Sequence, residues 1–287
     1  MKIAVASGKG GTGKTMVATS LAVALADHYS VQFLDCDVEA PNAHLFLNPS
    51  FEFEEEAIIP IPEIDANLCN HCGRCVEVCN FNALASIGPN ILVFPQLCHG
   101  CGSCTLQCQV NAITEKPRSI GKLRKGNTLS GIAFRQGELT ISEPMPSPII
   151  HQLKTGLNPQ EDLIIFDSPP GASCSVVATI YDADFLLLVT EPTPFGLHDL
   201  RQMLGVVAKT GTPAGVIINR DGLGVAKLEG YLEEQSIPIL MRIPYRSDIA
   251  AGLAQGKLLV ELFPEYKVVF KELHQTIKTT LLQAKER

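Results

Sequence analysis

The stretch Gly8-Lys9-Gly10-Gly11-Thr12-Gly13-Lys14-Thr15 decides the fold of this chain. It fits the pattern G-x-x-x-x-G-K-[ST], follows an apolar run at residues 2–7, and precedes a segment with helical apolar spacing at 15–26. In such a loop, backbone N–H groups and the helix N-terminus surround phosphate oxygens, Lys14 neutralises them, and the Thr15 hydroxyl binds Mg²⁺. We therefore predict a P-loop that binds ATP with Mg²⁺.

The same alternation of strand and helix recurs along the chain. Continuous apolar runs of strand length stand at 31–34, 162–167, 185–190 and 215–219, and helical stretches stand at 174–181, 197–209, 225–235 and 264–285. Runs that are apolar throughout are typical of parallel strands buried on both faces. The sequence predicts an α/β fold with a doubly wound, mainly parallel sheet.

Composition excludes several classes of protein. The chain has 287 residues, of which 46% are hydrophobic and 18% charged, so it can bury a substantial core. A net charge of −7 argues against a protein that works by neutralising nucleic-acid phosphates. Apolar runs such as 185–189 are far shorter than the ~20 residues of a membrane-spanning helix. We expect a cytoplasmic protein with no nucleic-acid partner and no stable membrane insertion.

Eight of the ten cysteines lie between positions 69 and 108, in two similar halves with the spacing C-x2-C-x2-C-x3-C. Bacterial two-cluster ferredoxins share this spacing, and in them the fourth cysteine of each half ligates the other [4Fe-4S] cluster. Zinc is the alternative, although a tetrahedral zinc site has no role for a third cysteine at the same spacing. We expect one cluster at Cys69, Cys72, Cys75 and Cys108, and a second at Cys98, Cys101, Cys104 and Cys79.

The strand and helix alternation breaks where these cysteines stand. We expect a small α+β ferredoxin domain at 60–117, inserted between two parts of the P-loop ATPase at 1–59 and 118–287. Four basic residues follow the insert, and they are either a solvated loop or a docking patch for an acidic redox partner: Arg118, Lys122, Arg124 and Lys125.

Lys9 adds a second lysine to the P-loop, which then reads KGGTGKT. This loop resembles the deviant Walker A motif of the MinD/ParA superfamily of ATPases, whose relatives include the nitrogenase iron protein and Mrp-type cluster carriers. The resemblance implies that Lys9 reaches across a dimer to the nucleotide of the partner subunit. It therefore implies a homodimer in the ATP state.

Further motifs agree with this resemblance. The segment 35–42 resembles switch I, which implies that Asp37 orients the attacking water, and 167–171 resembles switch II. Asn219 and Arg220 resemble the segment that reads adenine. The implied catalytic residues are Lys9, Lys14 and Asp37. The implied magnesium residues are Thr15 and Asp167, and the implied nucleotide-binding residues are Gly8, Lys9, Gly10, Gly11, Thr12, Gly13, Lys14, Thr15, Asp167, Gly171, Asn219 and Arg220.

Two cysteines lie outside the insert. Cys36 fits a small apolar core position, whereas Cys174 stands seven residues after Asp167, where the nitrogenase iron protein has a cluster ligand. Cys174 is therefore either a structural thiol or a redox residue.

The motifs together predict an ATPase whose nucleotide-dependent dimerisation gates electron transfer from two [4Fe-4S] clusters to a redox partner. The alternative is a carrier in iron-sulfur cluster assembly that delivers clusters to a receiving protein. Mrp-type carriers use a C-x2-C motif near the C-terminus, and no cysteine follows Cys174 here. A spatial organiser of the MinD/ParA kind, a third class, has no need of two clusters.

Overall fold

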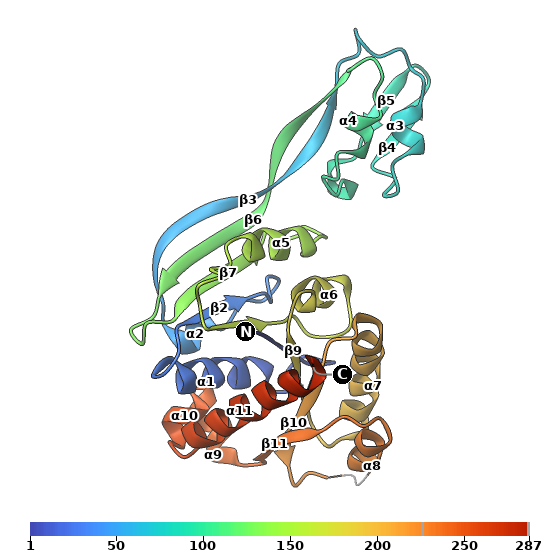
Figure 1. The fold of residues 1–287 in the computed structure, drawn as a ribbon. Helices are drawn as coiled ribbons and strands as arrows, with labels where there is room; N and C mark the ends of the chain where they lie inside the picture. Colours follow the sequence, from blue (N-terminus) through green and yellow to red (C-terminus); the bar gives the residue numbers. More distant parts are fainter. Residues whose placement is uncertain (225–226, 286–287) are drawn as a thin grey trace.

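The computed structural model describes residues 1–224 and 227–285 and is built on a nine-stranded sheet (Figure 1). The strand order is β11-β10-β9-β1-β8-β2-β7-β6-β3, and neighbours from β11 to β7 are parallel. These parallel strands are β1 (Lys2–Ala6), β2 (Val31–Asp35), β7 (Ala133–Leu139), β8 (Leu163–Asp167), β9 (Phe185–Thr190), β10 (Ala214–Asp221) and β11 (Ile239–Pro244). The predicted α/β fold with a mainly parallel sheet is confirmed.

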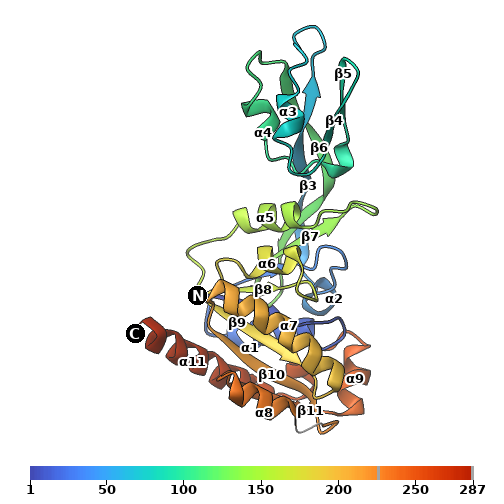
Figure 2. The same ribbon diagram turned by 90° about the vertical axis from the view of Figure 1, so that its right-hand side faces the viewer.

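Helices cover both faces of this sheet (Figure 2). Alternate residues of β1 point to opposite sides, so that Ile3 and Val5 belong to one buried apolar cluster and Ala4 and Ala6 to the other. The first face is covered by α1 (Lys14–Ala26), α9 (Ser247–Leu253), α10 (Leu259–Leu262) and α11 (Tyr266–Lys285). The second is covered by α5 (Ser147–Thr155), α6 (Cys174–Ile180), α7 (Pro194–Thr210) and α8 (Lys227–Glu234).

Helix boundaries differ from the sequence expectation where local chemistry sets them. The helix expected at 197–209 begins at Pro194, because proline fits the first helical turn and the Thr193 hydroxyl accepts a hydrogen bond from the Gly196 N–H. Residues 225 and 226 of the helix expected at 225–235 lie outside the described residues.

The final helix, α11, packs on α1 through an apolar stripe. Phe270, Leu273 and Ile277 are all buried on the side that faces the sheet. In residues 1–224 and 227–285, no helix combines the length and the apolar character needed to cross a lipid bilayer.

A long two-stranded ribbon leaves the edge of the sheet (Figure 1). Its strands, β3 (Ser50–Ile64) and β6 (Ile113–Asn127), have 15 residues each and pair antiparallel along their whole length. Pro60 and Pro117, the expected limits of the insert, are partners across the ribbon. The sequence did not predict these strands, because a ribbon exposed to solvent needs no continuous apolar run and tolerates proline at its edges.

The far end of the ribbon carries a small domain that holds the eight clustered cysteines (Figure 2). This domain consists of α3 (Arg74–Glu77), the hairpin of β4 (Leu84–Ile87) and β5 (Asn90–Val93), η1 (Pro95–Leu97) and α4 (Ser103–Leu106). The short helix α2 (His44–Leu47) is not part of it and lies at the opposite end of the ribbon, before β3. Of the 48 residues in 65–112, all of them described, four are buried: Ala83, Leu84, Cys98 and Ala112. This domain therefore has very little apolar core.

The four basic residues expected in a loop lie on β6 instead. Arg118 forms an ion pair with Glu143 at 2.7 Å, and Lys122 and Arg124 both bind Glu54, at 2.8 and 2.7 Å. Lys125 lies over the Phe53 ring at 4.3 Å. The expectation of a loop is wrong, because residues 118–125 belong to a strand. Lys122, Arg124 and Lys125 contact the facing strand β3, whereas Arg118 ties the ribbon to Glu143 after β7.

Candidate functional site

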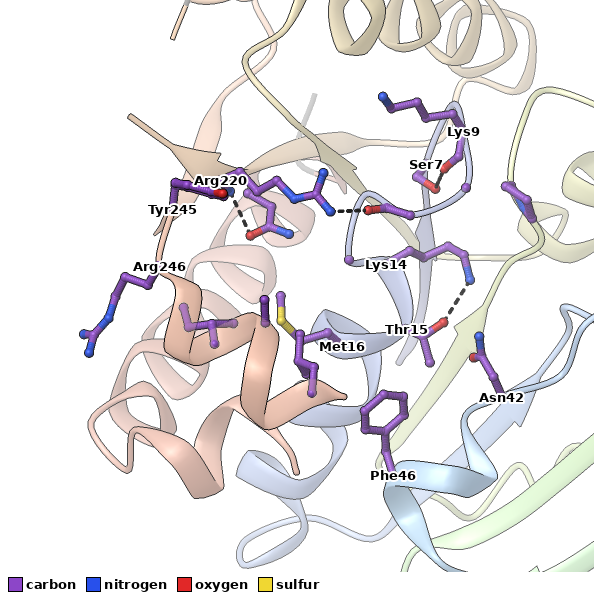
Figure 3. A pocket seen from close by; sticks show the side chains of 18 of the residues that line it. Ser7, Lys9, Lys14, Thr15, Met16, Asn42, Phe46, Arg220, Tyr245 and Arg246 are labelled. Carbon is purple, nitrogen blue, oxygen red and sulfur yellow. Dashed lines mark hydrogen bonds between the residues drawn. The ribbon is translucent and has the colours of Figure 1, made fainter. Parts of the chain in front are cut away.

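The carboxyl ends of the neighbouring strands β10, β9, β1, β8 and β2 bring most of the predicted nucleotide residues to one edge of the sheet. A cavity of about 300 Å³ opens there (Figure 3). It is lined by Lys14, Thr15, Asp37, Asn219 and Arg220. Residues that the sequence analysis did not single out also line it: Met16, Phe46, Pro244, Tyr245, Arg246, Ile249, Ala250 and Leu253. Parallel sheets bind ligands at this edge.

The P-loop closes tightly against the loops beside it. Gly13 has a φ of 94°, and a Cβ there would lie 2.3 Å from Asn219 Nδ2. A Cβ on Gly8 would lie 2.4 Å from the Asp199 carbonyl oxygen. Both positions therefore require glycine. Gly10 and Gly11 face open space, as a loop that admits a ligand requires.

Lys14, Thr15 and Asp167 meet at the base of the cavity. Lys14 Nζ lies 2.5 Å from Asp167 Oδ1, and the Thr15 hydroxyl donates to Asp167 Oδ2 at 2.7 Å. A hydroxyl beside a carboxylate fits the oxygen ligands that Mg²⁺ prefers. These residues would hold Mg²⁺ and the terminal phosphates of a nucleotide, where the metal would neutralise charge.

Three carboxylates gather around the buried Lys14 ammonium. Burial lowers the pKa of Lys14, but Asp167, Asp37 and Asp35 raise it, and the net shift is upward. Burial, together with the Asp167 charge, raises the pKa of Asp37 to about 6 and that of Asp35 to about 8. The site therefore carries surplus negative charge that a divalent cation would offset.

Asp35 also shapes the loop that follows β2. Its carboxylate accepts hydrogen bonds from the backbone N–H groups of Asn42 and Ala43, both at 3.0 Å, and of Asp37 at 3.2 Å. Cys36 lies between the two aspartates and is fully buried, and its pKa is raised chiefly by that burial. Cys36 is therefore a core residue, as predicted.

Asn219 and Arg220 hold the P-loop from the end of β10. Asn219 Nδ2 donates to the Thr12 carbonyl at 2.7 Å, and Arg220 Nη2 donates to the Gly11 carbonyl at 3.0 Å. The Asn219 amide oxygen accepts from the Arg220 N–H at 2.8 Å. Asn219 thus has a loop-holding contact that the sequence analysis did not foresee.

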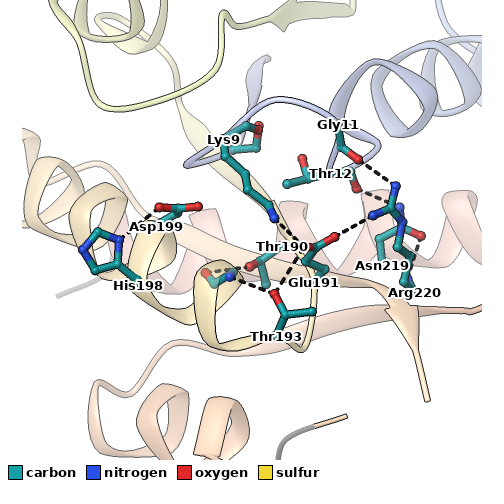
Figure 4. Close-up of polar contacts among 12 residues, drawn as sticks. Lys9, Gly11, Thr12, Thr190, Glu191, Thr193, His198, Asp199, Asn219 and Arg220 are labelled. Atoms are coloured by element: carbon teal, nitrogen blue, oxygen red, sulfur yellow. Dashed lines mark hydrogen bonds and ion pairs between the residues drawn. The ribbon is translucent and has the colours of Figure 1, made fainter. Parts of the chain in front are cut away.

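Lys9 points toward Glu191 of its own chain (Figure 4). Its Nζ lies 2.5 Å from Glu191 Oε1, and the Ser7 hydroxyl donates to the Lys9 carbonyl at 2.8 Å. Sequence reasoning missed Glu191. Its position directly after the predicted strand 185–190 was the available signal, because residues at that point reach the ligand edge.

The loop after β8 is held against β1, and the helix after it contacts α5. The Gly171 N–H donates to the Ser7 carbonyl at 2.9 Å, and α6 then begins at the exposed Cys174. At the far end of α6, Lys154 of α5 donates to the carbonyl oxygens of Ala178 and Thr179, at 3.1 and 3.2 Å, and also to that of Tyr181. A lysine at a helix C-terminus stabilises its unpaired carbonyls.

The same helix α5 also contacts the ribbon. The Gln152 side chain donates to the Ile58 carbonyl at 2.9 Å and accepts from the Ile58 N–H at 3.2 Å. Gly121 and Gly137 leave room for Ile149, which a Cβ at either position would approach to 2.5 or 2.7 Å. Helix α5 therefore joins α6 to the ribbon.

The eight cysteines surround two cavities in the outer domain. One cavity is lined by Cys79, Cys98, Cys101 and Cys104, and the other by Cys69, Cys72, Cys75 and Cys108. Backbone N–H groups of Ala83, Gly100 and Ala112 donate to the sulfurs of Cys79, Cys98 and Cys108 at 3.3, 3.5 and 3.2 Å. In residues 1–224 and 227–285, no three His, Cys, Asp or Glu side chains converge closely enough to hold a single metal ion.

Comparison with known proteins agrees with this arrangement. Residues 3–260 match the CobQ/CobB/MinD/ParA nucleotide binding domain. The chain is similar to the uncharacterised protein MJ0578 of Methanocaldococcus jannaschii, with 32% identity covering 97% of this chain and 96% of that protein. It is 24% identical to a cytosolic Fe-S cluster assembly factor, the Nubp2 homolog of Anopheles gambiae, with 96% of each chain covered.

Among solved structures, the fold is similar to that of the septum site-determining protein MinD of Pyrococcus horikoshii complexed with Mg-ADP. The TM-score is 0.59 at 21% sequence identity, and the match covers 96% of this chain and 95% of that one. The P-loop, the strand order and the family match lead to one conclusion: the chain belongs to the CobQ/CobB/MinD/ParA family of nucleotide-binding proteins.

Proposed function

We propose that the protein is an ATPase in which nucleotide-dependent dimerisation gates electron transfer from two [4Fe-4S] clusters to a redox partner. Lys14 would bind the β and γ phosphates, Thr15 and Asp167 would hold Mg²⁺, and Asp37 would orient the attacking water. Lys9 would complete the site of the partner subunit. Hydrolysis in such sites depends on positioning and on stabilising charge.

The cysteine geometry supports two clusters rather than zinc. A zinc site usually takes two C-x2-C pairs, whereas each half of residues 65–112 has a third cysteine at the same spacing, as [4Fe-4S] sites do. The cysteines stand four and four around cavities, with backbone N–H groups donating to three of the sulfurs. Bound clusters would supply one-electron transfer, and these N–H groups would tune its potential.

The contacts of α5 are the main support for the proposed coupling between the nucleotide site and the cysteine domain. Lys154 holds the end of α6, whose other end follows the loop of Asp167, and Gln152 holds the ribbon at Ile58. A second route leads from the Asp35–Asn42 loop through α2 directly into β3. A change at the γ-phosphate therefore has two continuous structural paths into the ribbon, which leads to the cysteine domain.

A carrier in iron-sulfur cluster assembly is the second candidate, and the similarity to the Nubp2 homolog favours it. The two functions differ in what leaves the protein. An electron-transfer ATPase keeps its clusters through each cycle, whereas a carrier releases them to an apo-protein when ATP is added.

The test is an anaerobic redox titration of the iron-loaded protein, followed by EPR, with ADP or with a slowly hydrolysed ATP analogue. We expect a potential shift of roughly 60 mV, which corresponds to tenfold in a one-electron equilibrium. Lys9→Ala should remove the shift. Equal potentials and equal rates of electron transfer to methyl viologen in both states would refute gating, and ATP-dependent loss of iron to apo-ferredoxin would favour the carrier.

The assignment of ligands has its own test. Cys79→Ser should damage the cluster bound mainly by Cys98, Cys101 and Cys104, and Cys108→Ser should damage the other. EPR signals of the two clusters distinguish these outcomes. Damage confined to the cluster of the same half-motif would show that the fourth cysteines are not exchanged.

A further inference from the structure

Glu191 occupies a central position at the ligand edge. It is the first residue after β9, and β9 lies between β1, which leads into the P-loop, and β10, which leads into Asn219 and Arg220. Its side chain is only 6% exposed. A charged side chain buried at this depth is stable only with partners.

Two cations of the same chain bind the Glu191 carboxylate from opposite sides (Figure 4). Lys9 Nζ lies 2.5 Å from Oε1, which also accepts from the Thr193 hydroxyl at 3.2 Å. Arg220 Nη1 lies 2.8 Å from Oε2. Arg220 also donates to the Gly11 carbonyl, so that Glu191 is connected to both sides of the P-loop.

The two cations have different roles in this network. Burial raises the pKa of Glu191, but the hydrogen bond and charge of Lys9 and the charge of Arg220 outweigh it and hold the pKa below its ordinary value. Arg220 is the more exposed of the two cations, at 45% against 33% for Lys9, but Arg220 has a second hydrogen bond, to the Gly11 carbonyl, that holds it beside Glu191. Lys9 can therefore leave while Arg220 still compensates the buried carboxylate.

We propose that Glu191 is a positioning residue that holds Lys9 within its own subunit, so that ATP-driven pairing of two subunits must first break the Lys9–Glu191 ion pair. The proposal rests on the proposed function, in which Lys9 acts on the partner subunit's nucleotide. Glu191 thereby sets how tightly two ATP-loaded subunits associate. Glu191 opposes the pairing of subunits because Lys9 must give up its ion pair with Glu191 before it can bind the phosphates of the partner subunit's nucleotide. The net free energy gained by that binding is therefore smaller.

The test measures the dimer dissociation constant of the iron-loaded protein by analytical ultracentrifugation, with Mg²⁺ and a non-hydrolysable ATP analogue. Glu191→Gln should tighten the dimer about tenfold, within the range of typical coupling between sites. Lys9→Ala should abolish the dimer, and the double variant should behave like Lys9→Ala. Glu143→Gln is the matched control, because it removes a similarly buried ion pair, with Arg118, on the ribbon side of the molecule.

The outcomes separate this proposal from the proposed function. A Lys9→Ala protein that still dimerises refutes the action of Lys9 across the dimer. If Lys9→Ala fails to dimerise but Glu191→Gln dimerises as the wild type does, or more weakly, the proposed effect of Glu191 on dimerisation is refuted. The proposed function is then unaffected. The affinity of the monomer for ADP is measured in parallel, and a large loss of it in Glu191→Gln would assign Glu191 a structural role in the P-loop.

Discussion

The nucleotide-binding core and the cysteine domain are stabilised in different ways. In the core, alternate residues of the parallel strands enter two large apolar clusters, one under each layer of helices. In residues 65–112, four of 48 residues are buried, and eight of the 48 are cysteines. Burial of apolar area is the main source of stability in a core of the first kind. The cysteine domain is too small for burial of its apolar surface alone to stabilise its fold.

This difference shows where bound groups matter for folding. The nucleotide site is assembled by strand ends that the core already holds, so a ligand adds to an existing structure. In the cysteine domain the proposed cluster ligands take the place of an apolar core, so the binding energy of the proposed clusters would also be folding energy.

The largest predicted effect tests this contrast directly. Removal of iron by a chelator should unfold residues 65–112, whereas the core should keep its affinity for ADP. Hydrogen exchange should show near-complete loss of protection in the cysteine domain and little change in β1, β8 and β9. A cysteine domain that stays protected without iron would contradict the contrast.

Within the core, the two P-loop lysines should behave differently. Lys14→Ala should weaken ATP binding about 100-fold, because a charged hydrogen-bond donor to phosphate is lost from a buried site. Lys9→Ala should change ATP affinity of the monomer little, while dimerisation and hydrolysis are lost. Calorimetry and ultracentrifugation measure the two effects, and equal phenotypes would argue against the separate roles.

The link between the two regions is tested on α5. Gln152→Leu removes both hydrogen bonds to Ile58, and each such bond contributes about 1 kcal/mol. The variant should reduce the difference in cluster potential between the ATP and ADP states by at least half, with ADP affinity unchanged. His151→Leu, an exposed neighbour on the same helix, is the control. If the difference in cluster potential is unchanged in Gln152→Leu, α5 is not the coupling path, and the route through α2 is the remaining one.

A smaller effect concerns the pH dependence of hydrolysis. The pKa of Asp37 is raised to about 6, chiefly by burial, so its carboxylate becomes protonated as the pH falls through that value. The ATPase rate should fall on the acid side of about pH 6, since a protonated Asp37 orients water poorly. Asp37→Asn should be slow at every pH. A wild-type rate that is flat between pH 5 and 7 would contradict this role.

The smallest effect concerns the stability of the core in acid. His274 of α11 is 2% exposed, and burial lowers its pKa from 6.5 to about 4. His274 therefore becomes protonated below pH 6.5 in the unfolded chain but only below about pH 4 in the folded chain. The free energy of unfolding decreases as the pH falls through this window. Between pH 7 and pH 4.5 the loss is about 2 kcal/mol, and His274→Phe should remove it. Urea unfolding at pH 7 and pH 4.5 measures it.

The sequence by itself determined the parts of the protein whose structure is local. The P-loop, the strand at 185–190 and the paired cysteine halves depend on residue types at short, fixed spacings. Buried parallel strands show in sequence as continuous apolar runs, because both faces must exclude water. The nucleotide edge followed from these strands, since residues after parallel strands meet at one edge.

Only the tertiary structure decided the contacts between segments far apart in sequence. The ribbon of β3 and β6 has no buried apolar run, and its pairing joins residues on either side of the cysteine domain. Glu191 meets Lys9 from 182 residues away, and Gln152 meets Ile58 from 94 residues away. These contacts arise because the fold brings their elements together. A hydrogen bond between residues far apart in the sequence produces no short, regular pattern of residue types, so the sequence does not predict it.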